Sequence, residues 1–130
     1  MAGLVYAMIG VLRGVCCVRD EETLLALVTV VIPNWNGREM LQTCLDALAA
    51  QTCSDFAVIV VDNGSDDDSV AWVRENHRSV RVIENAQNRG FAAPVNQGIA
   101  ASSSPYVAVL NNDTEPAPGW LEACLLYTSP

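Results

Sequence analysis

Four runs of apolar, mostly β-branched residues alternate with segments of helical pattern, and this alternation constrains the fold more than any other feature. The runs are Leu27–Ile32, Phe56–Val61, Val80–Ile83 and Tyr106–Leu110. Continuous apolar runs are typical of strands buried on both faces, as in a parallel sheet covered by helices on each side. The sequence therefore predicts an α/β fold with an open, doubly wound, mostly parallel sheet.

The segments between these runs carry helix signals. Asn36 followed by Glu39 has the form of an N-cap with its capping-box partner. The apolar residues that then fall on one helical face are Met40, Leu41, Cys44, Leu45 and Leu48. We expect Ser65 to cap a second helix, Pro94 to lie in the first turn of a third, and Trp120 to begin a fourth.

Composition excludes several classes of protein. Apolar residues make up 51% of the 130 residues, so the chain can bury a core. Fifteen acidic and seven basic residues, all arginine, give a net charge of −8, which argues against binding to nucleic acid. The single histidine, His77, excludes sites built from several histidines. The absence of lysine excludes a P-loop, and no dinucleotide-binding G-x-G-x-x-G follows the first run. The five cysteines show no CxxC spacing and favour a reducing, cytoplasmic compartment.

Both ends of the chain differ from the regular middle. Residues 2–18 are nearly all apolar but are too short to span a membrane and lack the basic start of a signal peptide. We expect a buried or interfacial helix there; contact with a membrane surface and sequence from an upstream domain remain alternatives. Residues 124–130 resemble a translated sequencing-library adapter, so we expect a non-native tail. The expected division is an apolar segment at 1–26, a ligand-binding half-domain at 27–123, and the tail at 124–130.

Polar loops follow three of the apolar runs. They are Pro33–Gly37, Asp62–Ser65 and Asn111–Thr114, and all are rich in asparagine and aspartate. Ligands of open α/β sheets bind beyond the carboxyl ends of the strands. We therefore expect these loops to converge on one ligand site.

Four motifs in order carry a resemblance to a known family. They are Val28–Gly37, Val60–Ser65, the pair Asn88–Phe91 and Asn96–Gly98, and Leu110–Thr114. Together they resemble the first half of a family 2 glycosyltransferase of the GT-A fold, most closely its rhamnosyltransferase-like members. The resemblance covers Leu27 to Ala123.

The resemblance implies a site for a nucleoside-diphosphate sugar, linked to dTDP or UDP. The residues it assigns to the nucleotide are Pro33, Trp35, Asn36, Asp62, Asn63, Asn88, Gly90 and Asn112. It assigns Asp113 to a Mg²⁺ or Mn²⁺ ion, because Asn111-Asn112-Asp113 stands where the family has Asp-x-Asp. Structural roles remain open for these residues: turn formation for Asp62 and Asp113, and ordinary packing for Trp35.

The resemblance also implies the reaction of the parent enzyme, an inverting transfer of a sugar to a glycan or lipid-linked acceptor. The family's general base lies downstream of the metal motif, beyond this chain, so we expect the fragment to be inactive by itself. The parent would act in the cytoplasm, with peripheral association at the inner face of the membrane as one alternative. Two other candidates are a nucleotidyltransferase and a non-catalytic nucleotide-binding module. Nucleotidyltransferases usually have a Gly-rich, basic loop after the first strand, which this sequence lacks.

Overall fold

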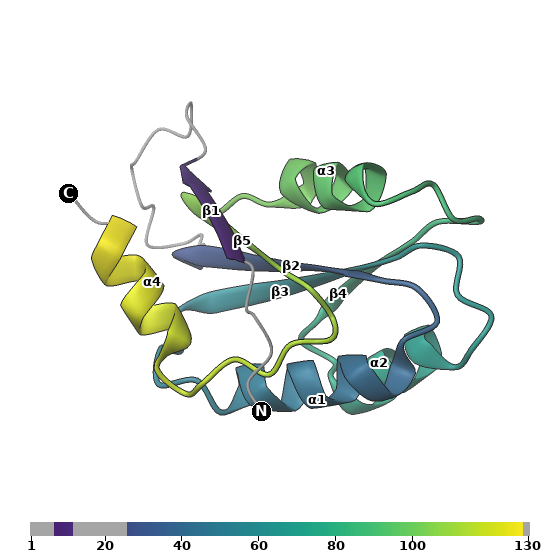
Figure 1. The fold of residues 1–130 in the computed structure, drawn as a ribbon, viewed down its shortest axis with the longest axis horizontal. Helices are drawn as coiled ribbons and strands as arrows, with labels where there is room; N and C mark the ends of the chain where they lie inside the picture. Colours follow the sequence, from purple (N-terminus) through teal and green to yellow (C-terminus); the bar gives the residue numbers. More distant parts are fainter. Residues whose placement is uncertain (1–6, 12–25, 129–130) are drawn as a thin grey trace.

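The computed structural model describes residues 7–11 and 26–128. In chain order the elements are β1 (Ala7–Val11), β2 (Val28–Asn34), α1 (Arg38–Ala49), β3 (Phe56–Asp62), α2 (Ser69–Asn76), β4 (Arg81–Glu84), α3 (Ala92–Ala101), β5 (Tyr106–Leu110) and α4 (Trp120–Thr128). The sheet formed by these residues has the order β1-β5-β2-β3-β4 (Figure 1). Strands β5, β2, β3 and β4 are parallel, so the predicted α/β fold is confirmed.

Helices cover both faces of the sheet, with α3 on one side and α1 and α2 on the other (Figure 1). Successive side chains of β2 point to opposite faces. Val30 and Ile32 pack with Leu41, Leu45 and other residues of the α1 side. Val31 belongs to a second cluster, with Ile59, Val61 and Val107, which packs against α3. Burial on both faces explains why the strands read as unbroken apolar runs.

Residues 7–11 form a strand, which corrects the helix expected for residues 2–18. β1 pairs antiparallel with β5, from Ala7 opposite Leu110 to Val11 opposite Tyr106. An apolar run fits a helix or a strand equally well, and the open edge of β5 offers backbone partners that only a strand can use. The remainder of the segment, residues 1–6 and 12–25, lies outside the described residues. At the other end of the chain, α4 extends to Thr128 and thus includes the first five residues of the segment 124–130.

The loops at the helix starts differ from the sequence prediction. The N-cap of α1 is Gly37, and Asn36 adopts a positive φ of 48°. Instead of capping α1, Asn36 accepts a hydrogen bond from the Asp66 N–H at 2.7 Å and donates its own N–H to Ser65 Oγ at 2.9 Å. Ser65 therefore does not cap α2, which begins at Ser69. These contacts join the loop after β2 to the loop after β3.

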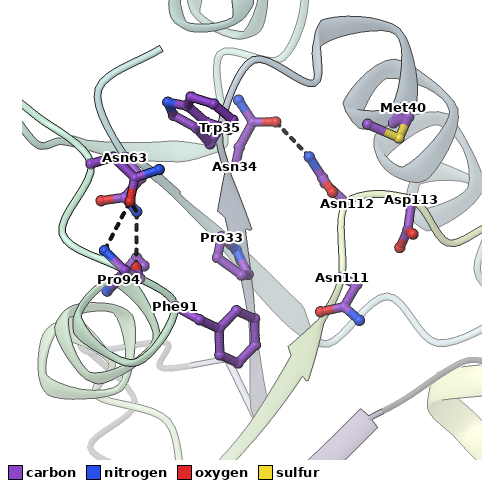
Figure 2. A pocket seen from close by; sticks show the side chains of 12 residues that line it. Pro33, Asn34, Trp35, Met40, Asn63, Phe91, Pro94, Asn111, Asn112 and Asp113 are labelled. Carbon is purple, nitrogen blue, oxygen red and sulfur yellow. Dashed lines mark hydrogen bonds between the residues drawn. The ribbon is translucent and has the colours of Figure 1, made fainter.

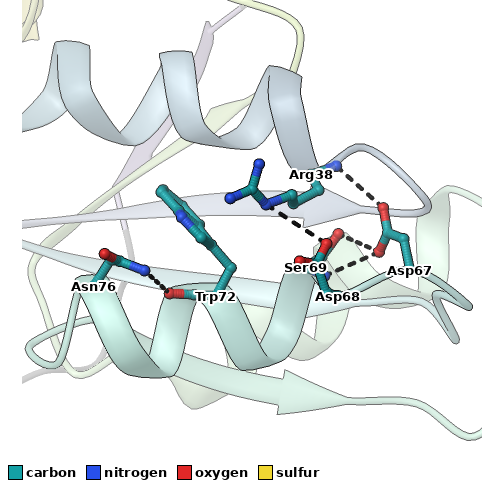
Figure 3. Close-up of polar contacts among 6 residues, drawn as sticks. All are labelled: Arg38, Asp67, Asp68, Ser69, Trp72 and Asn76. Carbon is teal, nitrogen blue, oxygen red and sulfur yellow. Dashed lines mark hydrogen bonds and ion pairs between the residues drawn. The ribbon is translucent and has the colours of Figure 1, made fainter.

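The start of α1 is held by the loop before α2 (Figure 3). The Arg38 N–H donates to Asp67 Oδ2 at 3.2 Å, and Arg38 Nε lies 3.5 Å from Asp68 Oδ1. The Arg38 guanidinium also lies 5.2 Å from the centre of the Trp72 ring. Burial acts to raise the pKa of Asp67, but hydrogen bonds from Ser69 and Arg38 outweigh it and lower the pKa. Asp67 thus supplies the capping group from a distant part of the chain.

No helix within the described residues is long and apolar enough to cross a membrane.

Candidate functional site

The strand order reverses between β2 and β5. From β2 the chain proceeds to β3 and β4 on one side, and then returns to place β5 on the other side of β2. The β2–β5 ladder ends at the pair Val31 and Val109, whereas β2 stays paired with β3 as far as Asn34 and Asp62. The carboxyl ends of β2 and β5 therefore diverge. A reversal of this kind is where open α/β sheets bind ligands.

A cavity of about 430 Å³ lies at this divergence (Figure 2). Its lining residues are Pro33, Asn34, Trp35, Met40, Asn63, Asn88, Gly90, Phe91, Pro94, Asn111, Asn112 and Asp113. They come from the end of β2, from the loops after β2, β3 and β5, from the segment that leads into α3, and from the first turns of α1 and α3. The volume falls within the range of about 300–1,000 Å³ typical of small-molecule sites.

Seven of the nine residues assigned from sequence line this cavity. They are Pro33, Trp35, Asn63, Asn88, Gly90, Asn112 and Asp113. Asn36 and Asp62 are not among the lining residues, since Asn36 faces the Asp66 backbone and Asp62 lies behind the wall with 3% exposure. Sequence reasoning did not assign Asn34, Met40, Phe91, Pro94 and Asn111 to the site.

A chain of hydrogen bonds crosses the ends of β3, β2 and β5. Asn34 Nδ2 donates to Asp62 Oδ1 at 3.0 Å, and Asn112 Nδ2 donates to Asn34 Oδ1 at 2.8 Å. Asp62 also accepts from the Ser65 N–H at 2.9 Å and from Ser65 Oγ at 2.6 Å. Most of the acceptor sites of the Asp62 carboxylate are therefore occupied by hydrogen bonds from Asn34 and Ser65.

Asn63 holds the opposite wall through its side-chain amide. Its Nδ2 donates to Asn88 Oδ1 at 3.0 Å and to the Gly90 carbonyl at 2.9 Å. Its Oδ1 accepts from the Arg89 N–H at 3.0 Å and from Asn85 Nδ2 at 3.3 Å. An amide offers two donor hydrogens and two acceptor lone pairs, so all the hydrogen-bonding capacity of Asn63 is used within the protein. Its place in the site is to shape the loop that carries Gly90 and Phe91.

Large apolar side chains at the cavity remain accessible to solvent. Trp35 is 53% exposed, Met40 45% and Phe91 64%. Met40 is thus exposed, unlike the other apolar residues of the predicted helical face, Leu41, Cys44, Leu45 and Leu48. Figure 2 places Trp35 and Phe91 on either side of Pro33. Exposed aromatic groups beside a polar cavity provide faces on which a planar ring can stack.

Asp113 lies in the loop after β5 and is exposed to solvent. Within the described residues its carboxylate has no hydrogen-bond or ion-pair partner. The loop is anchored by Thr114, which is buried and donates its hydroxyl to the Asn111 carbonyl at 2.6 Å. The fixed backbone thus presents one unpaired carboxylate to the cavity.

The donor set fits a hard divalent cation that is shared with a phosphate ligand. Over residues 7–11 and 26–128 no group of three or more His, Cys, Asp and Glu side chains could hold a metal by itself. Mg²⁺ characteristically binds through one or two carboxylates, with the remaining positions taken by water and substrate phosphates. Asp113 with the side-chain oxygen of Asn111 meets that requirement.

Cys44 of α1 packs beneath this loop. Its Sγ lies 3.9 Å from the Asn111 carbonyl and 4.0 Å from Thr114 Oγ1. Burial raises the pKa of Cys44 from 9.0 to about 11; the contact with Thr114 opposes this rise, and the charge of Asp113 adds to it. The neutral thiol is therefore the form present at physiological pH.

We expect Cys44 to resist thiol reagents in the folded protein at pH 8. A pKa two units higher lowers the thiolate fraction about 100-fold, and burial limits access further. Because the folded-state pKa is raised, the stabilisation from this thiol is complete below pH 9.0 and is lost as the pH rises towards 11. Timed labelling followed by mass spectrometry measures the rate, with the half-buried Cys53 as the reference. Labelling of Cys44 as fast as Cys53 would contradict this environment.

The fold and this site together define a class: an α/β domain of the GT-A type with a cavity of small-molecule size at its topological switch point. The chain belongs to glycosyl transferase family 2, whose model matches residues 29–128.

Known proteins with similar sequences carry glycosyltransferase names. Glycosyltransferase AglE of Haloferax volcanii is 36% identical over 103 residues, which cover 75% of this chain and 34% of that protein. The pre-mycofactocin glycosyltransferase of Mycobacterium tuberculosis is 37% identical over 103 residues, or 75% of this chain and 20% of that protein. The chain thus spans about a third or less of the length of these curated relatives.

Solved structures show the same fold. S. aureus TarS 1-349 in complex with UDP superposes with a TM-score of 0.71 at 22% identity, over 77% of this chain and 31% of that one. The mannosyltransferase PcManGT from Pyrobaculum calidifontis, in complex with GDP-Man and Mn²⁺, gives a TM-score of 0.64 at 26% identity. That match covers 72% of this chain and 30% of the mannosyltransferase.

Proposed function

We propose that this chain is the donor-binding part of a glycosyltransferase and that its cavity binds a nucleoside-diphosphate sugar. The observation that carries the proposal is the position of Asp113: an unpaired carboxylate at the cavity, on the loop after β5, where β2 and β5 diverge. Solved structures support the ligand class, since TarS is seen in complex with UDP and with UDP-GlcNAc, and PcManGT in complex with GDP-Man.

The cavity offers a distinct environment to each part of such a ligand. Trp35 and Phe91 provide exposed faces for the base, and Asn88 and Asn112 provide amide groups for ribose hydroxyls. Asp113 and Asn111 would hold a Mg²⁺ or Mn²⁺ ion together with the diphosphate. When bound, that ion neutralises the negative charge of the diphosphate. The complex of PcManGT with Mn²⁺ supports this assignment.

For the parent enzyme we propose inverting transfer of a sugar to a glycan or lipid-linked acceptor of the cell surface. The specific candidate for the sugar is rhamnose, from a dTDP- or UDP-linked donor. Inverting transfer requires a general base at the acceptor hydroxyl. Asp113 is the only carboxylate that lines the cavity in the described part of the chain. Since we assign Asp113 to the cation, we expect the isolated chain to bind the donor without turning it over.

The presence of only one carboxylate in the cavity lining of the described residues also favours one alternative function. A cavity with a single carboxylate also suits a non-catalytic module that binds a nucleotide. We propose that the protein acts in the cytoplasm, because five cysteines, an odd number without CxxC spacing, favour a reducing compartment. Association of the parent enzyme with the inner face of the membrane is part of the proposal.

Calorimetric titration with UDP, dTDP and GDP, each with and without Mn²⁺, tests the proposed ligand class. We expect at least one of these nucleotides to bind, and to bind more tightly when Mn²⁺ is present. Failure of all three to bind a folded chain would reject the proposal. Binding that does not respond to Mn²⁺ would favour the non-catalytic module.

Replacement of Trp35 tests the place of the base. The variant Trp35→Ala should weaken nucleotide binding about tenfold, because stacking of one base on an aromatic side chain contributes about 1–3 kcal/mol. Trp35→Phe keeps an aromatic face and should retain most of the affinity. Both variants should fold normally, since the Trp35 side chain is 53% exposed. Equal affinity of Trp35→Ala and the unchanged protein would remove Trp35 from the site.

A further inference from the structure

Asn34 lies at the centre of the hydrogen-bond chain, with only 2% exposure. It is opposite Asp62 in the β2–β3 register, and its side chain contacts Asn112 of the loop after β5. The β2–β5 ladder has already ended at Val31 and Val109. Beyond that pair, the Asn34–Asn112 hydrogen bond reconnects the two diverging strands beside the cavity (Figure 2).

The charge of Asp62 dictates how both amides are oriented. A carboxylate only accepts hydrogen bonds, so Asn34 must turn its Nδ2 towards Asp62. Asn34 Oδ1 then faces Asn112, and Asn112 must in turn present its own Nδ2. Asn112 Oδ1 is then left as an acceptor, and within the described residues no donor contacts it. The orientation therefore passes from a buried charge to an acceptor oxygen at the cavity.

Gly37 supplies independent support for a specific role of this contact. A Cβ built on Gly37 would collide with Asn112 Nδ2 and would lie 3.0 Å from Asn34 Oδ1. Gly37 does not have a positive φ, so backbone freedom does not require glycine at this position. The space that it leaves is filled by the pair of amides.

We propose that Asn34 is a positioning residue which, held by Asp62, fixes the Asn112 amide so that its oxygen faces the ribose hydroxyls of the bound nucleoside diphosphate. This inference rests on the proposed function. Asn34 itself need not touch the ligand. Its role is to transmit the polarity of Asp62 across β2 to the loop that carries Asp113.

An exchange of the two residue types tests the relay. In Asp62→Asn the acceptor-only group is lost, so either orientation of the Asn34 amide is allowed and nucleotide affinity should fall about tenfold. In Asn34→Asp two buried carboxylates face each other, and both stability and affinity should fall. The double variant Asn34→Asp with Asp62→Asn restores one donor and one acceptor, and residue 34 again accepts from Asn112. We expect it to bind at least tenfold more tightly than Asn34→Asp alone.

Calorimetry of the full chain with UDP, dTDP and GDP in the presence of Mn²⁺ measures these affinities. Asn76→Asp is the matched control, because the Asn76 amide is exposed and, among the described residues, donates only to the Trp72 carbonyl within α2, at 3.0 Å (Figure 3). It should bind as the unchanged protein does. Wild-type affinity in folded Asp62→Asn, or no recovery in the folded double variant, would overturn the proposal.

A readout that needs no ligand separates this proposal from the proposed function. In ¹⁵N spectra, the side-chain amide of Asn112 should exchange slowly with solvent in the unchanged protein and in the double variant. It should exchange fast in Asn34→Ala, which removes the acceptor. If no nucleotide binds and this pattern is seen, the relay stands and the proposed function fails. Fast exchange of the Asn112 amide in the unchanged protein would reject the relay directly.

Discussion

Replacing Asp113 by alanine is expected to abolish the Mn²⁺-dependent part of nucleotide binding, with a loss of about 100-fold in affinity, or about 2.7 kcal/mol. Asp113 is the only carboxylate lining the cavity within the described residues, so nothing else in the wall can take over its charge. The substitution should leave the fold intact, since the side chain is exposed and has no hydrogen-bond partner in the described part of the chain. Calorimetry with and without Mn²⁺ measures the loss.

The matched control for this variant is Glu115→Ala. Glu115 is an exposed carboxylate two residues further along, outside the cavity lining, and its loss should leave affinity unchanged. Asp113→Ala should also lower the pKa of Cys44, because the charge of Asp113 contributes to raising it. A variant that is folded, shows this pKa change and still binds nucleotide in a Mn²⁺-dependent manner would contradict the assignment of Asp113.

Replacing Gly98 by alanine is expected to lower the free energy of unfolding by about 2 kcal/mol, or the melting temperature by roughly 10 °C. Gly98 is buried in α3 where the helix crosses β2, and an added Cβ would overlap Cγ1 of Val31. Val31 is fully buried and β-branched, so it has little freedom to move aside. Chemical or thermal unfolding measures the effect.

Two further variants make the Gly98 prediction specific. Gly119→Ala, where an added Cβ meets nothing within 4 Å, should change stability by less than about 0.5 kcal/mol. Val31→Ala removes the atoms that the new Cβ would meet. The double variant Gly98→Ala with Val31→Ala should therefore be more stable than the sum of the two single effects by about 1 kcal/mol. Strict additivity of the single effects would show that the close approach to Val31 is not the cause.

The fold was largely readable from the sequence because its strands are buried on both faces. Burial of this kind makes β2, β3 and β5 continuous apolar runs, and hydrophobic periodicity is the strongest signal that a single sequence carries. The run at residues 7–11 gave no such guidance. It is apolar in a way that suits helix and strand alike, and its pairing with β5 depends on a strand edge about a hundred residues away.

The location of the cavity could be predicted from the sequence, but the residues that line it could be predicted only in part. Loops at the carboxyl ends of parallel strands converge by topology, so the sequence predicts that the loops after β2 and β5 lie at one cavity. Within these loops, the resemblance to the family points to Trp35, Asn112 and Asp113. Asn36 lies in the loop after β2 and Asp62 is the last residue of β3, but their side chains turn into contacts with Asp66 and Ser65. The direction of a side chain within a loop depends on partners that sequence spacing does not reveal.

The amino-acid sequence is enough to predict the α/β alternation, the edge of the sheet that carries the polar loops, and the four ordered motifs of the family. Those features depend on local pattern and chain order, which a sequence contains in full. The packing of the elements was needed to show that Asp67 caps α1, that the Asn63 amide bonds entirely within the protein, and that Asn34 connects Asp62 to Asn112. Each of these depends on which donor meets which acceptor across elements distant in sequence, and that choice is made only when the elements pack.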